Sequence, residues 1–199
     1  MVDLSTVGPR AAADAAQILA PLGVTYVDGP VSGGVAGARA GTVSLMFAGP
    51  SSALDDHRPL FEAFAKVFPV GSSAGQGQAM KLLNNFLSAT ALASTSEALA
   101  FGEAHGLDMS VMVDVLNAST GRNSATVDKF PNRVMTGTYD AGFHTRLMAK
   151  DLRLYVETVR AAGTADDVGS TVSDVWQRTD AALPDSDFTE IWRFVTRAL

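Results

Sequence analysis

Lys81 and Asn85 are the residues whose types and spacing most strongly indicate chemistry. They stand four residues apart in a stretch with helical character, so both side chains project from one face near the start of a helix. A lysine ammonium beside a carboxamide combines a proton donor with a group that positions its partner. Asparagine is a poor choice for a helix interior without a polar task, and Asn84 precedes Asn85 directly. The pattern favours a functional pair, with a solvated lysine beside a poorly helical asparagine as the alternative.

The segment Ser32-Gly33-Gly34 is a second candidate, because it follows a run rich in strand-forming residues. Consecutive glycines let backbone N–H groups approach an anion closely, and the serine hydroxyl adds a further donor. Such a segment is suited to holding the carboxylate of a substrate. A plain glycine turn before the next strand is the alternative, and the residues by themselves leave both open.

Three further patterns carry weaker signals. Gly75-Gln76-Gly77 resembles the opening of a dinucleotide-binding fingerprint, but Met80 occupies the position of the third glycine. Lys150-Asp151 lies in a strongly helical run, where such a pair is most often a surface charge pair. Arg122 is a candidate clamp for a carboxylate, and an exposed loop arginine is the alternative.

Composition excludes several classes of protein. Of the 199 residues, 47% are hydrophobic and 18% are charged, as in a globular protein with one large domain or two small ones. The net charge of −6 and the lack of basic runs argue against nucleic-acid binding. No cysteine is present, which excludes disulfides, thiolate zinc sites and cysteine nucleophiles. The histidines have no ligand spacing, so we expect no metal and interpret them as structural: His57, His105 and His144.

No targeting or membrane segment is expected. The first ten residues, MVDLSTVGPR, contain neither the basic nor the apolar part of a signal peptide, so the cytoplasm is the expected compartment. The longest apolar stretch, Leu82–Phe101, contains Asn84, Asn85 and Glu97 among many small polar residues. This composition is too polar for a bilayer span and predicts a core helix that is buried on most sides.

The elements that position these residues divide the chain into two regions. Up to about Ser73, strands are expected at 2–4, 24–28, 42–48 and 67–70, and helices at 10–22 and 52–66. Beyond Gly75, a helical run of roughly 30 residues reaches about His105. Further helices are expected at 109–117, 126–135 with a break at Pro131, 145–162, 167–183 and 188–199. The predicted fold class is α/β plus all-α, with a partial, mostly parallel sheet, a long interdomain helix and a helical C-terminal domain.

Four motifs, in this order, resemble the motif set of the β-hydroxyacid dehydrogenases and cover nearly the whole chain: Asp3–Pro9, Asp28–Gly34 with the following glycines, Gly75–Asn85, and Phe143 with Leu147–Leu152. Within that family, a second set of residues is most similar to the 3-hydroxyisobutyrate dehydrogenase branch: Leu116-Asn117, Ser119, Gly121-Arg122 and Asp187-Phe188.

The resemblance implies hydride exchange between NAD or NADP and a short 3-hydroxy acid, similar to 3-hydroxyisobutyrate, with its semialdehyde as the oxidised form. Lys81 would be the catalytic acid/base, and Asn85 would orient the substrate beside it. The other implied contacts are with the substrate carboxylate for Ser32, Gly33 and Gly34, and with the cofactor for Ser5, Thr6 and Lys150.

Members of the family begin with a dinucleotide-binding domain whose first strand and helix carry G-x-G-x-x-G. The resemblance therefore implies that residues 1–73 are the C-terminal half of a Rossmann-like domain and that 74–199 form the all-helical dehydrogenase domain. On that basis we expect the chain to be inactive until the missing half is supplied. The choice between NAD and NADP stays open, because that half senses the ribose 2′ position. The resemblance also implies a homo-oligomer, either a dimer or a tetramer.

Two alternatives remain at this point. One is a non-catalytic helical oligomerisation module, which would form a stable dimer that binds neither NAD nor NADP. The other is a relative such as tartronate semialdehyde reductase or another semialdehyde reductase, distinguished by the semialdehyde that is turned over.

Overall fold

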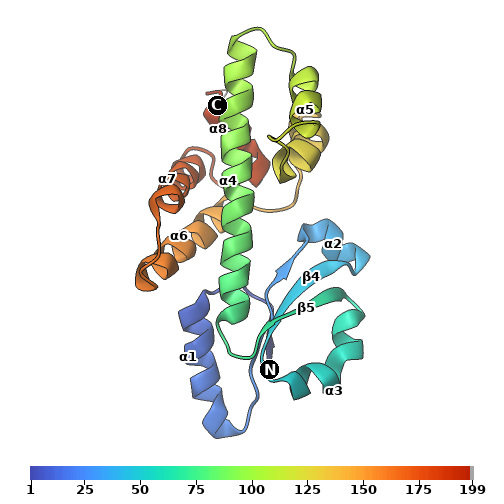
Figure 1. Cartoon of the computed structure of the whole chain (residues 1–199), viewed down its shortest axis with the longest axis vertical. Coiled ribbons are helices and arrows are strands. Elements are labelled where there is room, and N and C mark those ends of the chain that lie inside the picture. Colours follow the sequence, from blue (N-terminus) through green and yellow to red (C-terminus); the bar gives the residue numbers. More distant parts are fainter. Residues whose placement is uncertain (198–199) are drawn as a thin grey trace. The chain divides into compact units, whose positions relative to one another are not determined.

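The structure, a computed structural model, describes residues 1–197 and forms two compact units. The first comprises Met1–Asn84 and Leu154–Ala165, and the second comprises Asn85–Arg153 and the residues from Asp166 onward. The predicted order of a strand-containing region followed by helices is confirmed (Figure 1). The predicted domain division at residues 73 and 74 stays a prediction. In the structure, the chain passes from the first unit to the second within the helix that begins at Gln76.

A mixed five-stranded sheet forms the centre of the first unit. β4 pairs in parallel with β5 and antiparallel with both β2 and β3, while β1 pairs in parallel with β2. The predicted partial sheet is confirmed, and its pairings are mixed, because β4 has a parallel neighbour in β5 and antiparallel neighbours in β2 and β3. The strands are β1 Val2–Asp3, β2 Val27–Asp28, β3 Val31–Ser32, β4 Val43–Ala48 and β5 Ala65–Gly71.

The antiparallel pairing follows from the short connection between β3 and β4. Only residues 33–42 separate these strands, whereas a parallel crossover needs about a dozen residues or more. The connection forms a short helix, α2 Gly34–Ala40, between Gly33 at φ +138° and Gly41 at φ +67°. The sequence analysis predicts no helix here, because a glycine-dense segment is typical of turns. In the structure, glycine supplies the positive φ values at both ends of α2.

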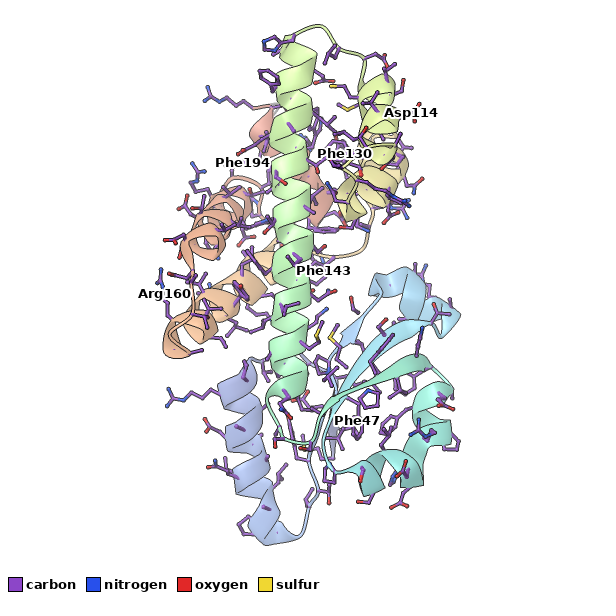
Figure 2. All side chains as sticks on the ribbon, viewed as in Figure 1. Phe47, Asp114, Phe130, Phe143, Arg160 and Phe194 are labelled. Atoms are coloured by element: carbon purple, nitrogen blue, oxygen red, sulfur yellow. The ribbon has the colours of Figure 1, made fainter. Side chains whose placement is uncertain are left out.

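The remaining helices of the first unit cover the sheet. In Figure 1, α1 Pro9–Leu19 and α3 Ser51–Glu62 lie on opposite sides of β4 and β5. Alternate side chains of β4, including Leu45 and Phe47, are buried with Phe61 of α3. The rings of Phe47 and Phe61 meet edge to face at 5.6 Å, and Figure 2 shows Phe47 inside this layer. The predicted helices at 10–22 and 52–66 are confirmed with small shifts of their ends.

The second unit consists of helices and connecting turns. It contains the later part of α4 Gln76–Ala104, the first part of α6 Thr145–Ala161, and further helices whose bounds are α5 Met109–Asn117, α7 Asp167–Ala182 and α8 Ile191–Val195. A 3₁₀ turn at Phe188–Glu190 precedes α8, so the predicted 188–199 helix is two shorter pieces, and its last two positions lie outside the described residues. Within residues 1–197, no helix is both long and apolar enough to span a bilayer.

The segment Ala125–Val134 is a π-helix that contains Pro131, where a break was expected. The N–H of Met135 donates to the carbonyl of Phe130 at 2.9 Å, which is the wider i→i+5 pattern of such a helix. This width accommodates a residue that lacks an N–H. Phe130 is fully buried in the helical unit (Figure 2) and meets Trp192 edge to face at 5.5 Å.

Gly77 in the first turn of α4 allows the helix to approach the sheet closely. A Cβ at this position would lie 2.7 Å from the carbonyl oxygen of Met46 and 2.8 Å from that of Asp28. Both atoms belong to the backbone of paired strands, so they cannot move aside cheaply. Glycine is therefore required here for packing of the helix against the strands.

Gly77→Ala is expected to lower the free energy of unfolding by about 1–3 kcal/mol, because the added methyl group overpacks a rigid contact. Gly102→Ala in the same helix is the control, because its Cβ would meet the flexible end of the Met112 side chain. Chemical denaturation of both variants measures the difference. Equal loss of stability in the two variants would contradict the close-approach explanation.

Candidate active site

The buried carboxylate of Asp28 caps the start of α4. Asp28 ends β2 and is fully buried. Its Oδ2 accepts hydrogen bonds from the backbone N–H groups of Gly75 (2.9 Å) and Gln78 (3.0 Å), which a helix start leaves without intrahelical partners. A negative charge at this end also interacts favourably with the helix dipole. Asp28 thus fixes the start of the helix that carries Lys81.

The side chain of Gln78 ties the loop between β1 and α1 to the same point. Its Oε1 accepts hydrogen bonds from the backbone N–H groups of Val7 (2.9 Å) and Gly8 (3.1 Å). Its Nε2 donates to the carbonyl of Ser5 (2.9 Å) and to Oδ1 of Asp28 (2.8 Å). All four hydrogen-bonding positions of the buried carboxamide are used. The Gln78 side chain of α4 therefore fixes the backbone of this loop by hydrogen bonds.

The same loop presents the predicted cofactor residues, with Ser5 exposed and Thr6 half-buried. Asp3 anchors its first residue, since Oδ1 accepts the Ser5 N–H (2.9 Å) and Oδ2 accepts the Tyr26 hydroxyl (2.9 Å). Burial raises the pKa of the Asp3 carboxyl, but these hydrogen bonds outweigh burial and leave its pKa below the ordinary value. Burial, reinforced by the hydrogen bond to Asp3, raises the pKa of Tyr26.

Gly75-Gln76-Gly77 serves packing within the first unit. Gly75 has φ +98°, and a Cβ there would lie 2.8 Å from the carbonyl oxygen of Pro9. Oε1 of Gln76 accepts the N–H of Ser73 at 2.9 Å. Both glycines approach carbonyl oxygens, which would repel a phosphate. The weak fingerprint is thus explained by the contact between the start of α4 and its neighbours.

The predicted substrate segment also lies in the first unit. Ser32 ends β3 half-buried, and Gly33 and Gly34 follow with φ +138° and +62°. A Cβ on Gly33 would lie only 3.2 Å from Cα of Val43, so the glycine is needed both for its φ value and for space. Nδ2 of Asn84 lies 3.5 Å from Oγ of Ser32, a long hydrogen bond that links this segment to α4.

Lys81 is buried, with 8% of its surface exposed, which excludes the solvated lysine that the sequence left as an alternative. It stands in the same turn of α4 as Asn84. Asn85 belongs to the continuation of this helix in the second unit and is also buried. The continuous helix thus carries both predicted residues one turn apart.

In the second unit, Asp151 joins Asn85 and Lys150. Nδ2 of Asn85 donates to Oδ2 of Asp151 at 2.6 Å, and Nζ of Lys150 lies 2.9 Å from Oδ1. The Asp151 side chain is 3% exposed and that of Lys150 is 35% exposed, so the interpretation as a surface charge pair is wrong. Asp151 orients the Asn85 amide, a role that sequence spacing alone does not indicate.

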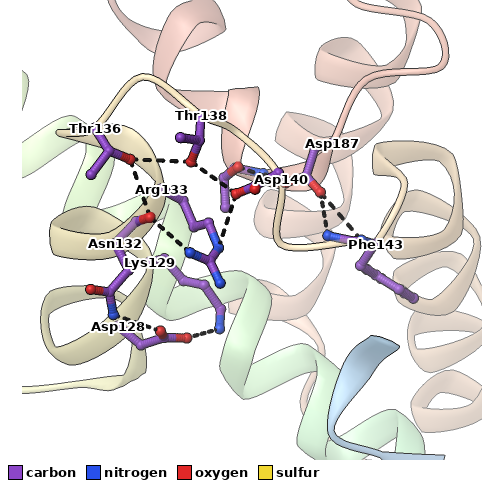
Figure 3. A network of polar contacts seen from close by, with 11 residues as sticks. Asp128, Lys129, Asn132, Arg133, Thr136, Thr138, Asp140, Phe143 and Asp187 are labelled. Carbon is purple, nitrogen blue, oxygen red and sulfur yellow. Dashed lines mark hydrogen bonds and ion pairs between the residues drawn. The ribbon is translucent and has the colours of Figure 1, made fainter. Parts of the chain in front are cut away.

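Asp187 holds the turn that leads into α6. Its Oδ2 accepts the N–H groups of Gly142 (2.8 Å) and Phe143 (3.3 Å), as Figure 3 shows. The N–H of Phe188 donates to the carbonyl of Phe143 at 2.8 Å, and Asp187 forms a capping box with Glu190. These bonds fix the beginning of the helix on which Lys150 and Asp151 lie.

The other candidates lie at the surface. Arg122 is exposed, in agreement with the loop alternative. All three histidines are exposed, and a ring nitrogen of each lies near a backbone carbonyl: His57, His105 and His144. Among residues 1–197, no group of His, Cys, Asp or Glu side chains is arranged to hold a metal ion.

Comparison with known families identifies both parts of the chain. Residues 75–195 match the family described as the NAD-binding domain of NADP-dependent 3-hydroxyisobutyrate dehydrogenase. The chain belongs to the β-hydroxyacid dehydrogenase family. Residues 1–79 match the NAD-binding domain of 6-phosphogluconate dehydrogenase. The predicted family, an NAD- or NADP-dependent oxidoreductase family, is therefore confirmed.

Individual dehydrogenases show the same relationship. The 3-hydroxyisobutyrate dehydrogenase of Pseudomonas aeruginosa is 35% identical, over 96% of this chain and 67% of that protein. An NAD-dependent L-serine dehydrogenase of the same organism is 36% identical, over 89% of this chain and 61% of that protein. The structure of Mycobacterium tuberculosis 3-hydroxyisobutyrate dehydrogenase with L-serine has a TM-score of 0.89 at 33% identity, and the match covers 98% of this chain and 69% of that one. The chain thus spans about two thirds of the length of these β-hydroxyacid dehydrogenases.

The lowered pKa of Asp3 predicts how the stability of the first unit depends on pH. Because the folded-state pKa lies below the ordinary value, the contribution of Asp3 is fully present above about pH 4 and is lost as pH falls through the folded-state pKa. Asp3→Asn is expected to be less stable than the parent at neutral pH, with a difference that shrinks on acidification. Urea unfolding at pH 7 and at about pH 3 measures this, and a pH-independent difference would contradict it.

Proposed function

We propose that this protein interconverts a short 3-hydroxy acid and its semialdehyde by hydride exchange with NAD or NADP, with Lys81 as the acid/base. The observation that carries the proposal is a buried lysine one helical turn before a buried asparagine, in a chain of the β-hydroxyacid dehydrogenase family. The family match favours this function over a non-catalytic oligomerisation module. The similarity to 3-hydroxyisobutyrate and serine dehydrogenases favours it over a reductase of the tartronate semialdehyde type.

Lys81 would manage the proton of the reaction. When bound, the nicotinamide ring supplies or accepts the hydride. During oxidation, Nζ would take the proton of the substrate hydroxyl, and during reduction it would return a proton to the carbonyl oxygen. A buried ammonium also stabilises negative charge that develops on this oxygen, because little water screens the interaction. The burial of Lys81 supports both roles.

Ser32, Gly33 and Gly34 would hold the substrate carboxylate. Gly33 and Gly34 are both exposed and carry no side chain over the turn, and the serine hydroxyl adds a donor. The contact between Ser32 and Asn84 ties this turn to the helix of Lys81. Asn85 would orient the substrate, with its amide fixed by Asp151.

The residues present fit the nicotinamide and ribose part of a dinucleotide cofactor. Ser5 and Thr6 lie on a loop whose backbone is already ordered by Asp3 and Gln78, so binding would cost little loop entropy. Their hydroxyl groups suit a polar amide or ribose. The partly exposed ammonium of Lys150 suits a polar or anionic part of the cofactor.

We further propose a cytoplasmic homo-oligomer, a dimer or a tetramer, that binds neither membranes nor nucleic acid. Leu87 and Phe101 on α4 support an oligomer, because 58% and 65% of their surfaces are exposed. The net charge of −6 supports the absence of a nucleic-acid partner.

In a protein that carries the complete dinucleotide-binding domain, Lys81→Ala is expected to lower turnover of a 3-hydroxy acid by at least about 10²-fold, because the acid/base is removed. The circular dichroism spectrum and NADH affinity should be retained. Lys66→Ala is the control, because Lys66 is an exposed lysine of the same unit. Steady-state kinetics of parent and variants test the assignment, and near-normal turnover in Lys81→Ala would overturn it.

The substrate class is tested in the same complete protein by turnover of 3-hydroxyisobutyrate, L-serine and glycerate with NAD and with NADP. We expect oxidation of at least one of the first two, since relatives with those substrates in their names are 35% and 36% identical to this chain. Preferred oxidation of glycerate would instead support the tartronate semialdehyde reductase alternative. If the protein with the complete dinucleotide-binding domain showed neither turnover nor NADH binding, the proposed function would be contradicted.

A further inference from the structure

The carboxamide of Gln78 is buried in the first unit and makes four hydrogen bonds. It contacts three residues of the loop between β1 and α1, and it also contacts Asp28. Gln78 and Asp28 are both fully buried. Gln78 stands three residues before Lys81, within one turn of α4. One side chain thus joins the predicted cofactor loop to the helix turn of the predicted acid/base.

We propose that Gln78 is a positioning residue that fixes the cofactor loop in register with Lys81, through its hydrogen bonds to the loop backbone and to Asp28. This inference rests on the proposed function for its catalytic consequence. Hydride transfer requires cofactor, substrate and proton donor to be aligned to within a fraction of an ångström. A shared anchor for the loop and the helix provides that alignment before any ligand binds.

The hydrogen-bond polarity of this site accepts glutamine and rejects glutamate. Oε1 faces two N–H donors, whereas Nε2 faces two acceptors, the Ser5 carbonyl and the Asp28 carboxylate. A carboxylate at position 78 would place an oxygen against both acceptors and a second negative charge beside Asp28. Shape would be conserved while two hydrogen bonds would become repulsive.

Gln78→Glu therefore tests the proposal with little change in volume. In a protein that carries the complete dinucleotide-binding domain, we expect NADH affinity to fall about tenfold or more at pH 8, together with kcat, because the loop loses its register. Burial and the Asp28 carboxylate would raise the pKa of the introduced carboxyl, so acidification would restore one donor. Affinity in this variant should improve as pH falls from 8 to 5.5, in contrast to the parent. Loss of NADH affinity that does not recover on acidification would contradict the hydrogen-bond explanation.

Gln76→Glu is the matched control. It introduces the same charge in the same helical turn, but Gln76 is exposed and uses only its acceptor oxygen, toward the N–H of Ser73. NADH affinity and its pH profile should stay within about twofold of the parent. The double variant Asp28→Asn with Gln78→Glu removes the charge repulsion and restores one donor–acceptor pair, so partial recovery at pH 8 is expected. Equal effects of the Gln76 and Gln78 variants would overturn the proposal.

Amide hydrogen exchange tests the anchoring hydrogen bonds from the Val7 and Gly8 N–H groups to Gln78 without a cofactor. The Val7 and Gly8 amides should exchange slowly in the parent, although Val7 is exposed, and at least about tenfold faster in Gln78→Glu. Fast exchange in the parent would contradict the anchor even if Gln78→Glu failed to fold. Slow exchange in a protein with neither NADH binding nor turnover would contradict the proposed function while leaving the anchor intact. Normal kinetics in a Gln78→Glu variant with fast exchange would contradict the positioning role.

Discussion

The buried carboxylate of Asp28 is the interaction on which the arrangement of the first unit depends. A charge in a fully buried position is tolerated only when hydrogen bonds replace its lost hydration. Here the first turn of α4 and the Gln78 carboxamide provide those bonds. The same interactions fix where the long helix starts, and therefore the position of Lys81 relative to the strands of the first unit. Gly77 makes this possible, because any side chain at that position would keep the helix away from the strands.

The second unit uses the same kind of constraint around a different carboxylate. Asp151 is buried between the Asn85 amide and the Lys150 ammonium, so the orientation of one site residue depends on the other. Asp187 holds the turn before α6, which fixes where Asp151 lies along that helix. In each unit, a predicted site residue thus lies beside a buried acidic side chain that orders its surroundings.

Local sequence signals predicted most helices and strands well. They failed where contacts with distant residues determine the conformation or the burial of a segment. The periodicity of α4 and of the later helices was strong enough to place them, because a buried face must recur at helical spacing. The short helix α2 was not predicted, because a glycine-dense segment is typical of turns. Pro131 was expected to break a helix that in fact continues with π geometry. The pair Lys150-Asp151 appeared typical of a surface, because burial is not visible in a two-residue pattern.

The sequence by itself determined the family, the two kinds of secondary structure and the candidate residues Lys81, Asn85 and Ser32-Gly33-Gly34. Motif order and helical spacing are local properties, so they can be recognised without knowing what the chain packs against. Tertiary structure alone decided that the sheet is mixed, that Asp151 is buried, and that Gln78 joins the Ser5 loop to α4. These features depend on contacts between residues as much as 73 positions apart. Long-range hydrogen bonds of this kind are set by the packing of complete elements, and no local pattern of residues encodes them.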